Sequence, residues 1–96
     1  MKKPETKFKE LVIKDLKTLK NTWFFKSQEV SRRGIPDLIL CVNGFFVAME
    51  LKVDSDLDAL QIYNINKIKE ANGWASEVTP KNWKKVFAYL KKLSEE

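Results

Sequence analysis

The chain has 96 residues, of which 44% are hydrophobic and 32% charged, and its Lys and Arg outnumber its Asp and Glu by 18 to 13. This length and composition predict one folded domain over residues 1–96, and the net charge of +5 favours a polyanionic partner. The absence of histidine excludes Ser-His-Asp triads and histidine-ligated zinc. The single cysteine, Cys41, excludes an intrachain disulfide and predicts a reducing, cytoplasmic location. The opening residues 1–5 do not look like a secretory signal, and the longest apolar run, residues 38–42, is too short to cross a membrane.

Hydrophobic periodicity and turn signals predict elements in the order α-β-β-β-α-β-α. The clearest signal is Asn43-Gly44, a two-residue hairpin turn between two strand-like runs. An α/β domain with a mixed sheet, a central hairpin and flanking helices is the economical arrangement. In chain order we expect a helix over 4–20, a strand over 23–25, a loop over 27–33, strands over 37–42 and 45–52, a helix over 56–71, a strand over 74–78 and a helix over 80–93.

Three short motifs set the expected helix ends. Ser55-x-x-Asp58 resembles a capping box that opens the second helix. Asn72-Gly73 ends it, with the glycine expected to take the left-handed conformation. Thr79-Pro80 is typical of an N-cap followed by a first-turn proline and therefore predicts the start of the last helix.

The hairpin register brings three ionisable side chains together. With Asn43-Gly44 as the turn, pairing back along the two strands places Asp37 directly opposite Glu50. Because side chains alternate between the two faces of a sheet, Lys52 projects on the same face as Glu50. The three groups are therefore expected at the end of the hairpin far from its turn.

This carboxylate pair needs a compensating charge if it is buried. Opposed β-carbons lie about 5 Å apart, and at an effective dielectric near 20 two such charges repel by roughly 3 kcal/mol. The other hairpin positions are apolar outside the turn, so we expect both faces to be covered. Lys52 offsets part of the repulsion, whereas a divalent cation offsets it fully, and oxygen ligands suit magnesium or manganese. A structural interpretation stays open, with Asp37 at a strand entry and Glu50 and Lys52 as an ion pair.

A third carboxylate can join the pair from the first helix. A helical wheel puts Glu5 on the apolar stripe with Val12 and Leu16, so it is expected to face the core and to seek a partner. Asp15 is a weaker competitor for this role. The alternative for Glu5 is a favourable interaction with the helix dipole in the first turn.

The run Arg32-Arg33-Gly34-Ile35-Pro36-Asp37, then twelve residues, then Glu50-Leu51-Lys52, with Gln61 on the following helix, resembles the PD-(D/E)XK nuclease superfamily. It looks most like the compact VRR-NUC branch, which is related in character to Holliday junction resolvases. The resemblance covers roughly residues 5–78. It implies a restriction endonuclease-like fold and hydrolysis of DNA phosphodiester bonds with Mg²⁺ or Mn²⁺.

The resemblance also implies roles for individual residues. Asp37, Glu50 and the backbone carbonyl of Leu51 would hold the metal, with Glu5 contributing directly or through water. Lys52 would orient or help to deprotonate the attacking water and stabilise charge on the phosphate. Gln61 would lie beside the site, near the metal or the lysine.

Basic side chains supply candidate DNA contacts. Arg32 and Arg33 precede the metal loop and are placed to grip phosphates beside the scissile bond, although solvated loop arginines are the alternative. The last helix has a basic face that either contacts DNA or is simply solvated. Its lysines are Lys81, Lys84, Lys85, Lys91 and Lys92.

The aromatic residues and the cysteine are expected inside the molecule. We expect core filling rather than base stacking for Trp23, Phe24, Phe25, Phe45 and Phe46. Cys41 has apolar neighbours and is expected to be an inert buried thiol.

The leading functional hypothesis is a metal-dependent endonuclease that selects branched or Holliday junction DNA, in DNA repair or recombination. A domain this small covers only part of such a substrate, so a homodimer with two active sites is attractive. A flap- or nick-type or restriction-like nuclease with the same site is a neighbouring alternative. A nucleic-acid-binding module that does not cut, and a structural or protein-interaction domain, are the alternatives from other classes.

Overall fold

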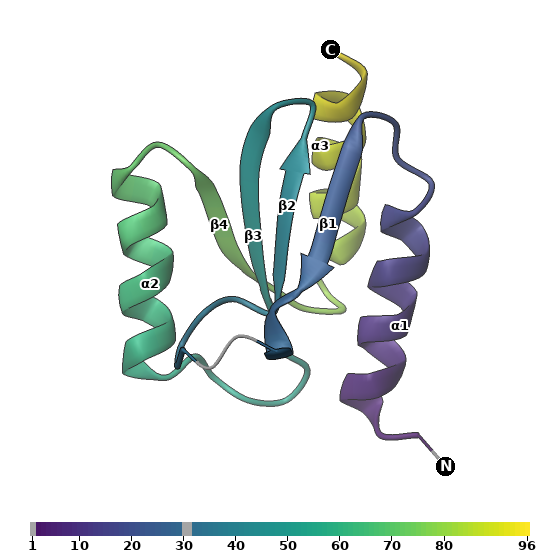
Figure 1. Ribbon diagram of the computed structural model, residues 1–96. Helices are drawn as coiled ribbons and strands as arrows, with labels where there is room; N and C mark the ends of the chain where they lie inside the picture. Colours follow the sequence, from purple (N-terminus) through teal and green to yellow (C-terminus); the bar gives the residue numbers. More distant parts are fainter. Residues whose placement is uncertain (1, 30–31) are drawn as a thin grey trace.

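The structure is a computed structural model that describes residues 2–29 and 32–96. The predicted order α-β-β-β-α-β-α is confirmed, in one compact α/β domain with a four-stranded sheet and three helices (Figure 1). The elements are α1 (Pro4–Leu16), β1 (Thr22–Lys26), the 3-10 turn η1 (Ser27–Glu29), β2 (Leu38–Val42), β3 (Phe45–Leu51), α2 (Ala59–Glu70), β4 (Trp74–Val78) and α3 (Trp83–Glu95). Of the predicted loop over 27–33, positions 30 and 31 lie outside the described residues. None of the described helices is both long enough and apolar enough to pass through a membrane.

The sheet has the strand order β1-β2-β3-β4, with antiparallel pairing at the first two junctions and parallel pairing between β3 and β4. The predicted hairpin register is confirmed, from Val42 opposite Phe45 to Leu38 opposite Met49. Asn43 and Gly44 both have positive φ, at 50° and 88°, as a turn matched to the twist of a hairpin requires. The turn chemistry therefore sets the register of the two central strands.

Helices cover the two faces of the sheet unequally. The helices α1 and α3 lie on one face, and α2 lies on the other, beside β4 (Figure 1). The main core fills the space under α1 and α3, whereas α2 covers only a small second cluster formed by Ala48, Ile65 and Ala75. The main core contains Phe8, Val12, Leu16, Leu38, Leu40, Val42, Val47, Met49, Val78, Trp83, Leu90 and Leu93.

The uncovered part of the α2 face exposes aromatic side chains. Trp23 is 64% exposed and Phe46 is 45% exposed, and Cys41 between them is also exposed. Phe25 is exposed on the same face, and Phe45 is exposed on the opposite face beside the turn. The expectations of a hairpin covered on both faces, of aromatic core filling and of a buried thiol are therefore wrong at these positions. One helix cannot cover a four-stranded sheet, so the half formed by β1 and β2 remains open.

The first helix is shorter than predicted, because it ends at Leu16 and a turn leads to Asn21, whose φ is 48°. Its buried side chains are Phe8, Val12 and Leu16. Glu5 is exposed, so its predicted place facing the core is wrong. Glu5 lies in the first turn of the helix, at the end of the apolar stripe, where the core no longer covers the helix.

Other helix ends also differ from the predicted ones. Helix α2 begins at Ala59, because Asp58 rather than Ser55 is the N-cap. At its end Asn72 takes the left-handed conformation, with φ 70°, and not Gly73. Gly73 is instead required by close packing, because a Cβ there would lie 2.8 Å from Cγ2 of Ile68. Helix α3 begins at Trp83, after a turn in which Asn82 and Thr79 exchange hydrogen bonds.

Candidate active site

The candidate site is the carboxylate pair at the end of the hairpin far from its turn. Continuing the register one step beyond Leu38 and Met49 places Asp37 opposite Glu50. One oxygen of Asp37, Oδ2, accepts a hydrogen bond of 2.9 Å from the backbone N–H of Leu51. Glu50 is only 4% exposed. The sheet therefore brings the two carboxylates together at the edge of a covered region, as the sequence predicted.

The neighbouring strand holds Asp37 in place. The backbone N–H of Ser27 donates to the carbonyl of Asp37 at 2.9 Å, and the Ser27 hydroxyl donates to the carbonyl of Pro36 at 2.6 Å. Ser27 is buried, and it follows β1 directly. The sequence analysis missed this residue, because its place opposite Asp37 follows only once the pairing of β1 with β2 is known.

Glu50 has an unusual electrostatic environment. Its Oε2 accepts a hydrogen bond of 3.1 Å from Nε2 of Gln61 and lies 3.9 Å from Nζ of Lys52. Its Oε1 is buried and has no hydrogen-bond partner among the described residues. Burial and then the negative charge of Asp37 raise the pKa of Glu50 to about 8, although the charge of Lys52 acts in the opposite direction. A buried carboxylate oxygen with no partner is the kind of group that a cation satisfies.

Gln61 connects the site to the start of α2. Its Oε1 accepts from the backbone N–H of Asp58, and its backbone N–H donates to Oδ1 of Asp58, both at 2.9 Å. This reciprocal capping box fixes the Gln61 side chain, whose Nε2 is then directed at Glu50. The structure thus brings Gln61 into direct contact with Glu50.

Lys52 lies just beyond β3. Its backbone N–H donates to the carbonyl of Val78 at 2.9 Å, which extends the parallel pairing of β3 with β4. Its side chain is 17% exposed, so the amine lies at the border between the site and solvent. This position lets Lys52 contact both Glu50 and a molecule that approaches from outside.

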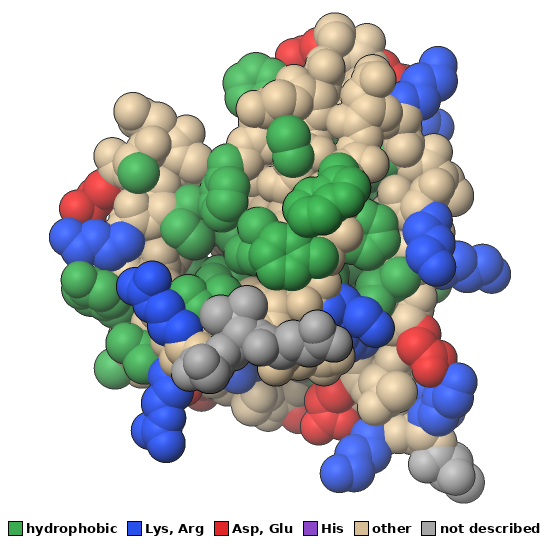
Figure 2. All heavy atoms as spheres, in the orientation of Figure 1, with side chains coloured by type: hydrophobic (Ala, Val, Ile, Leu, Met, Phe, Trp, Pro, Cys, Tyr) green, Lys and Arg blue, Asp and Glu red, His purple; other side chains and the backbone are tan. Residues whose placement is uncertain are grey.

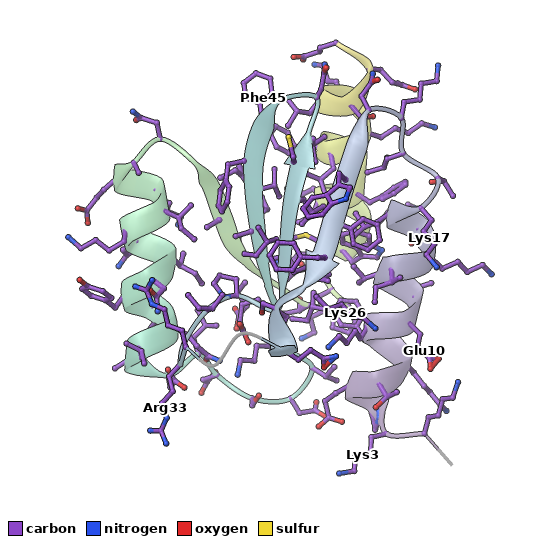
Figure 3. All side chains as sticks on the ribbon, in the orientation of Figure 1. Lys3, Glu10, Lys17, Lys26, Arg33 and Phe45 are labelled. Carbon is purple, nitrogen blue, oxygen red and sulfur yellow. The ribbon has the colours of Figure 1, made fainter. Side chains whose placement is uncertain are left out.

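A glycine anchors the loop that carries the two arginines. Gly34 has a φ of 77°, and a Cβ there would lie 2.6 Å from Cγ of Leu60 and 2.8 Å from Nδ2 of Asn64. Asn64, which is buried, donates from that amide to the carbonyl of Gly34 at 3.1 Å. The loop is therefore held against α2, and Figure 3 shows Arg33 extending outward from it. Asn64 was also missed from the sequence, because its contact joins segments 30 residues apart.

The predicted third carboxylate does not complete the site. Within residues 2–29 and 32–96, no group of three His, Cys, Asp or Glu side chains gathers closely enough to hold a metal ion. Asp15 accepts a hydrogen bond of 2.8 Å from the indole N–H of Trp83, so it has a structural role. Glu77 is the Cα partner of Glu50 in β4 and was missed from the sequence, because the parallel pairing carries no local signal.

Lys81, which precedes α3, and the lysines of α3 lie in the other layer of the molecule. Lys81, Lys84 and Lys85 are exposed, and α3 packs on the sheet face opposite to α2 (Figure 1). Because β3 and β4 are parallel, the start of α3 lies toward the same end of the sheet as Glu50. Lys91 and Lys92 lie toward the opposite end of the same helix.

The site presents oxygen atoms of the kind that bind hard divalent cations. Two carboxylates face each other, one buried oxygen has no partner among the described residues, and the backbone of Leu51 is adjacent. Leu51 contacts Asp37 through its backbone N–H, so the carboxylate oxygens of Asp37 and Glu50 are the candidate ligands, and Mg²⁺ and Mn²⁺ prefer oxygen. Two carboxylates and one amine therefore meet here, without a third acidic side chain close enough to share a metal ion among the described residues.

Comparison with known proteins adds no relative: no family model, no curated protein and no solved structure matches the chain.

Proposed function

We propose that this protein is a divalent-metal-dependent DNA endonuclease of the PD-(D/E)XK type, similar to the VRR-NUC branch, that hydrolyses phosphodiester bonds in branched DNA such as Holliday junctions. The observation that supports this most is Glu50, a buried carboxylate that faces Asp37, contacts Gln61 and Lys52, and keeps one oxygen without a partner among the described residues. In most structural ion pairs, the buried oxygens have hydrogen-bond partners.

The residues divide the chemistry among them. Asp37, Glu50 and the carbonyl of Leu51 would hold Mg²⁺ or Mn²⁺, and the fit does not depend on Glu5. When bound, this ion would lower the pKa of a water molecule and offset negative charge on the phosphate. Lys52 would orient the attacking water, take up its proton and stabilise the phosphate oxygens. No histidine is present to act as the general base in its place.

Other residues position these groups. Gln61 holds Glu50 through the hydrogen bond from Nε2, and Ser27 holds the backbone at Asp37. Arg32 and Arg33 would bind phosphates next to the scissile bond, because their loop leads directly to Asp37. A homodimer would present two such sites to the two strands of a junction.

The decisive experiment is cleavage of a labelled four-way junction with Mg²⁺ or Mn²⁺, and with EDTA in place of the metal. We expect metal-dependent cleavage by the parent and its loss in Glu50→Gln and Lys52→Ala, with Glu10→Gln, an exposed control on α1, as active as the parent. Mn²⁺ should also raise the melting temperature of the parent but not that of Glu50→Gln. Equal cleavage by Glu50→Gln and the parent would falsify the assignment of this residue.

A second candidate is a nucleic-acid-binding module that does not cut. It is favoured by one observation, that two carboxylates rather than three gather at the site among the described residues. Salt-sensitive junction binding without cleavage at any metal concentration would support this alternative. Matched flap, nicked and duplex substrates, with their products mapped, separate the leading proposal from nucleases of other substrate preference.

A further inference from the structure

An aromatic patch lies on the open half of the α2 face. We define it by Trp23, Phe25, Ile39, Cys41 and Phe46, which alternate with core residues on the three adjacent strands and share one face by register. Three of its rings are exposed, Trp23 by 64%, Phe46 by 45% and Phe25 by 38%. Figure 2 shows hydrophobic side chains gathered in the middle of this face, with Lys and Arg around them.

The patch is continuous with the candidate active site. Phe46 and Glu50 project from the same face of β3, four residues apart, which corresponds to about 13 Å at the rise of a strand. Ile39 lies two residues from Asp37 on that face. At about 3.4 Å of helical rise per nucleotide, a strand cut beside Glu50 reaches the patch within a few nucleotides.

Basic side chains border the patch on the side of α2. A hollow of about 440 Å³ lies there, and it is lined by Arg32 and Lys67 together with the patch residues Ile39 and Phe46. Nζ of Lys67 lies 3.5 Å from Oε1 of Glu70. Both side chains are more than half exposed, so this ion pair is weak. The hollow is therefore lined both by an aromatic ring and by positively charged side chains.

Taking the proposed endonuclease function as its basis, we infer that the aromatic patch binds unpaired nucleotides of the DNA substrate. Their bases stack on Trp23, Phe25 and Phe46, and their phosphates meet Arg32 and Lys67. Exposed aromatic rings beside a basic groove are how proteins bind single-stranded nucleic acid without regard to sequence. Among branched DNA substrates, the preferred one is then a branch with a single-stranded segment adjoining the scissile bond, rather than a fully paired junction.

Two other occupants fit the patch less well. A continuous duplex hides the faces of its bases by stacking, so it offers these rings nothing but its backbone. A second copy of the chain in a two-fold dimer would bring the same patch against itself, and Arg32 and Lys67 of each copy would then approach those of the other. This approach of like charges opposes a dimer formed through the patch.

The experiment measures binding in EDTA, so that it does not depend on cleavage. A short labelled single-stranded oligodeoxynucleotide and a blunt duplex of the same length are titrated with the parent, Trp23→Ala, Phe46→Ala and Phe45→Ala. Phe45 is the matched control, because it neighbours Phe46 and is 54% exposed but projects from the opposite face. We expect each patch variant to bind the single strand at least about fivefold more weakly than the parent. Phe45→Ala should bind the single strand as well as the parent, and all variants should bind the duplex with unchanged affinity.

A second readout uses Cys41, which lies between Trp23 and Phe46 in register. The single strand should slow its alkylation by iodoacetamide, and the duplex should not.

Unchanged single-strand affinity in both patch variants, or no single-strand binding by the parent, would overturn the inference. A parent dimer that Trp23→Ala converts to monomers would assign the patch to a second copy. If the parent binds the single strand but cleaves no DNA, the endonuclease proposal is contradicted and the inference about the patch is not.

Discussion

At Glu50, burial and the charge of Asp37 act in the same direction, and together they raise the pKa of this carboxyl to about 8 from an ordinary value of 4.5. Between these two values the folded protein binds a proton that the unfolded chain releases. The contribution of Glu50 to folding stability without metal therefore decreases as the pH rises through this range, which is opposite to the effect of a carboxylate in a strong salt bridge.

This linkage predicts a pH-dependent melting temperature in EDTA. From pH 4.5 to about 8 the melting temperature of the parent should decrease by at least about 4 °C more than that of Glu50→Gln, whose amide does not titrate. Differential scanning fluorimetry over this range measures the difference. Glu10→Gln is the control and should keep the slope of the parent. Parallel profiles for the parent and Glu50→Gln would show that Glu50 titrates normally.

Gln61 has two separable roles, because it shares the capping box with Asp58 but alone contacts Glu50. Gln61→Ala and Asp58→Ala should each lower the free energy of unfolding by about 1 kcal/mol through loss of the cap. Only Gln61→Ala should also weaken metal-dependent cleavage, because only it removes the hydrogen bond to Glu50. Urea unfolding and junction cleavage of both variants measure the two effects, and equal loss of cleavage would assign Gln61 a purely structural role.

At the scale of elements, the loop that leads to Asp37 is held against α2 at Gly34. Gly34→Ala places a Cβ against Leu60 and Asn64 at a positive φ, which should cost about 1–2 kcal/mol for the backbone and about 1–3 kcal/mol for the overlap. Gly44→Ala is the matched control, since its φ is 88° but no atom lies within 4 Å of the added Cβ. It should lose only the backbone part.

Denaturant unfolding compares the two glycine variants, and junction cleavage shows whether the loop still delivers Asp37. We expect Gly34→Ala to be the less stable variant and to cleave more slowly, because the contacts that hold the loop on α2 are disturbed. Similar stability and activity in both variants would mean that the loop adjusts freely and that its anchoring is unimportant.

The elements that the sequence predicted well are those with local causes. The hairpin follows from Asn43-Gly44, and the opposition of Asp37 and Glu50 follows from the hairpin by alternation alone. The start of α2 was less predictable, because Ser55 and Asp58 are both good caps. The structure uses Asp58, which forms a reciprocal capping box with Gln61 three residues later. Two competing local signals of this kind are not separated by hydrophobic periodicity.

Non-local pairing explains what the sequence missed at the site. Ser27 lies opposite Asp37 and Glu77 lies beside Glu50 only because β1 and β4 are the outer strands of the sheet. Cys41 and the aromatic side chains were expected inside, because apolar alternation does not reveal that a single helix covers the α2 face among the described residues. The opposition of the two carboxylates was thus predictable from the sequence, whereas their supporting contacts and the open surface were not.

At the scale of the whole molecule, positive charge is divided between the two layers. Arg32 lies on the α2 face, at the hollow beside the aromatic patch, and Arg33 precedes Asp37 on the same loop. Lys81, just before α3, and Lys84 and Lys85 in its first turn lie in the other layer, toward the end of the sheet that carries Glu50. Lys91 and Lys92 lie toward the other end of α3. If DNA binds at the candidate site on the α2 face, Arg32 and Arg33 can contact it directly, whereas Lys91 and Lys92 cannot.

This division predicts how the salt dependence of junction binding responds to mutation. Each phosphate contact that is lost should reduce the slope of log K against log salt by about 0.9. In EDTA, replacing Arg32 and Arg33 by alanine should therefore reduce the slope by nearly 2, whereas the same replacement of Lys91 and Lys92, which also removes two charges, should leave it unchanged. The equal change in net charge separates local phosphate contact from general attraction. Equal reductions in the two double variants would mean that the chain attracts DNA only through its overall charge, and that DNA does not approach by the α2 face.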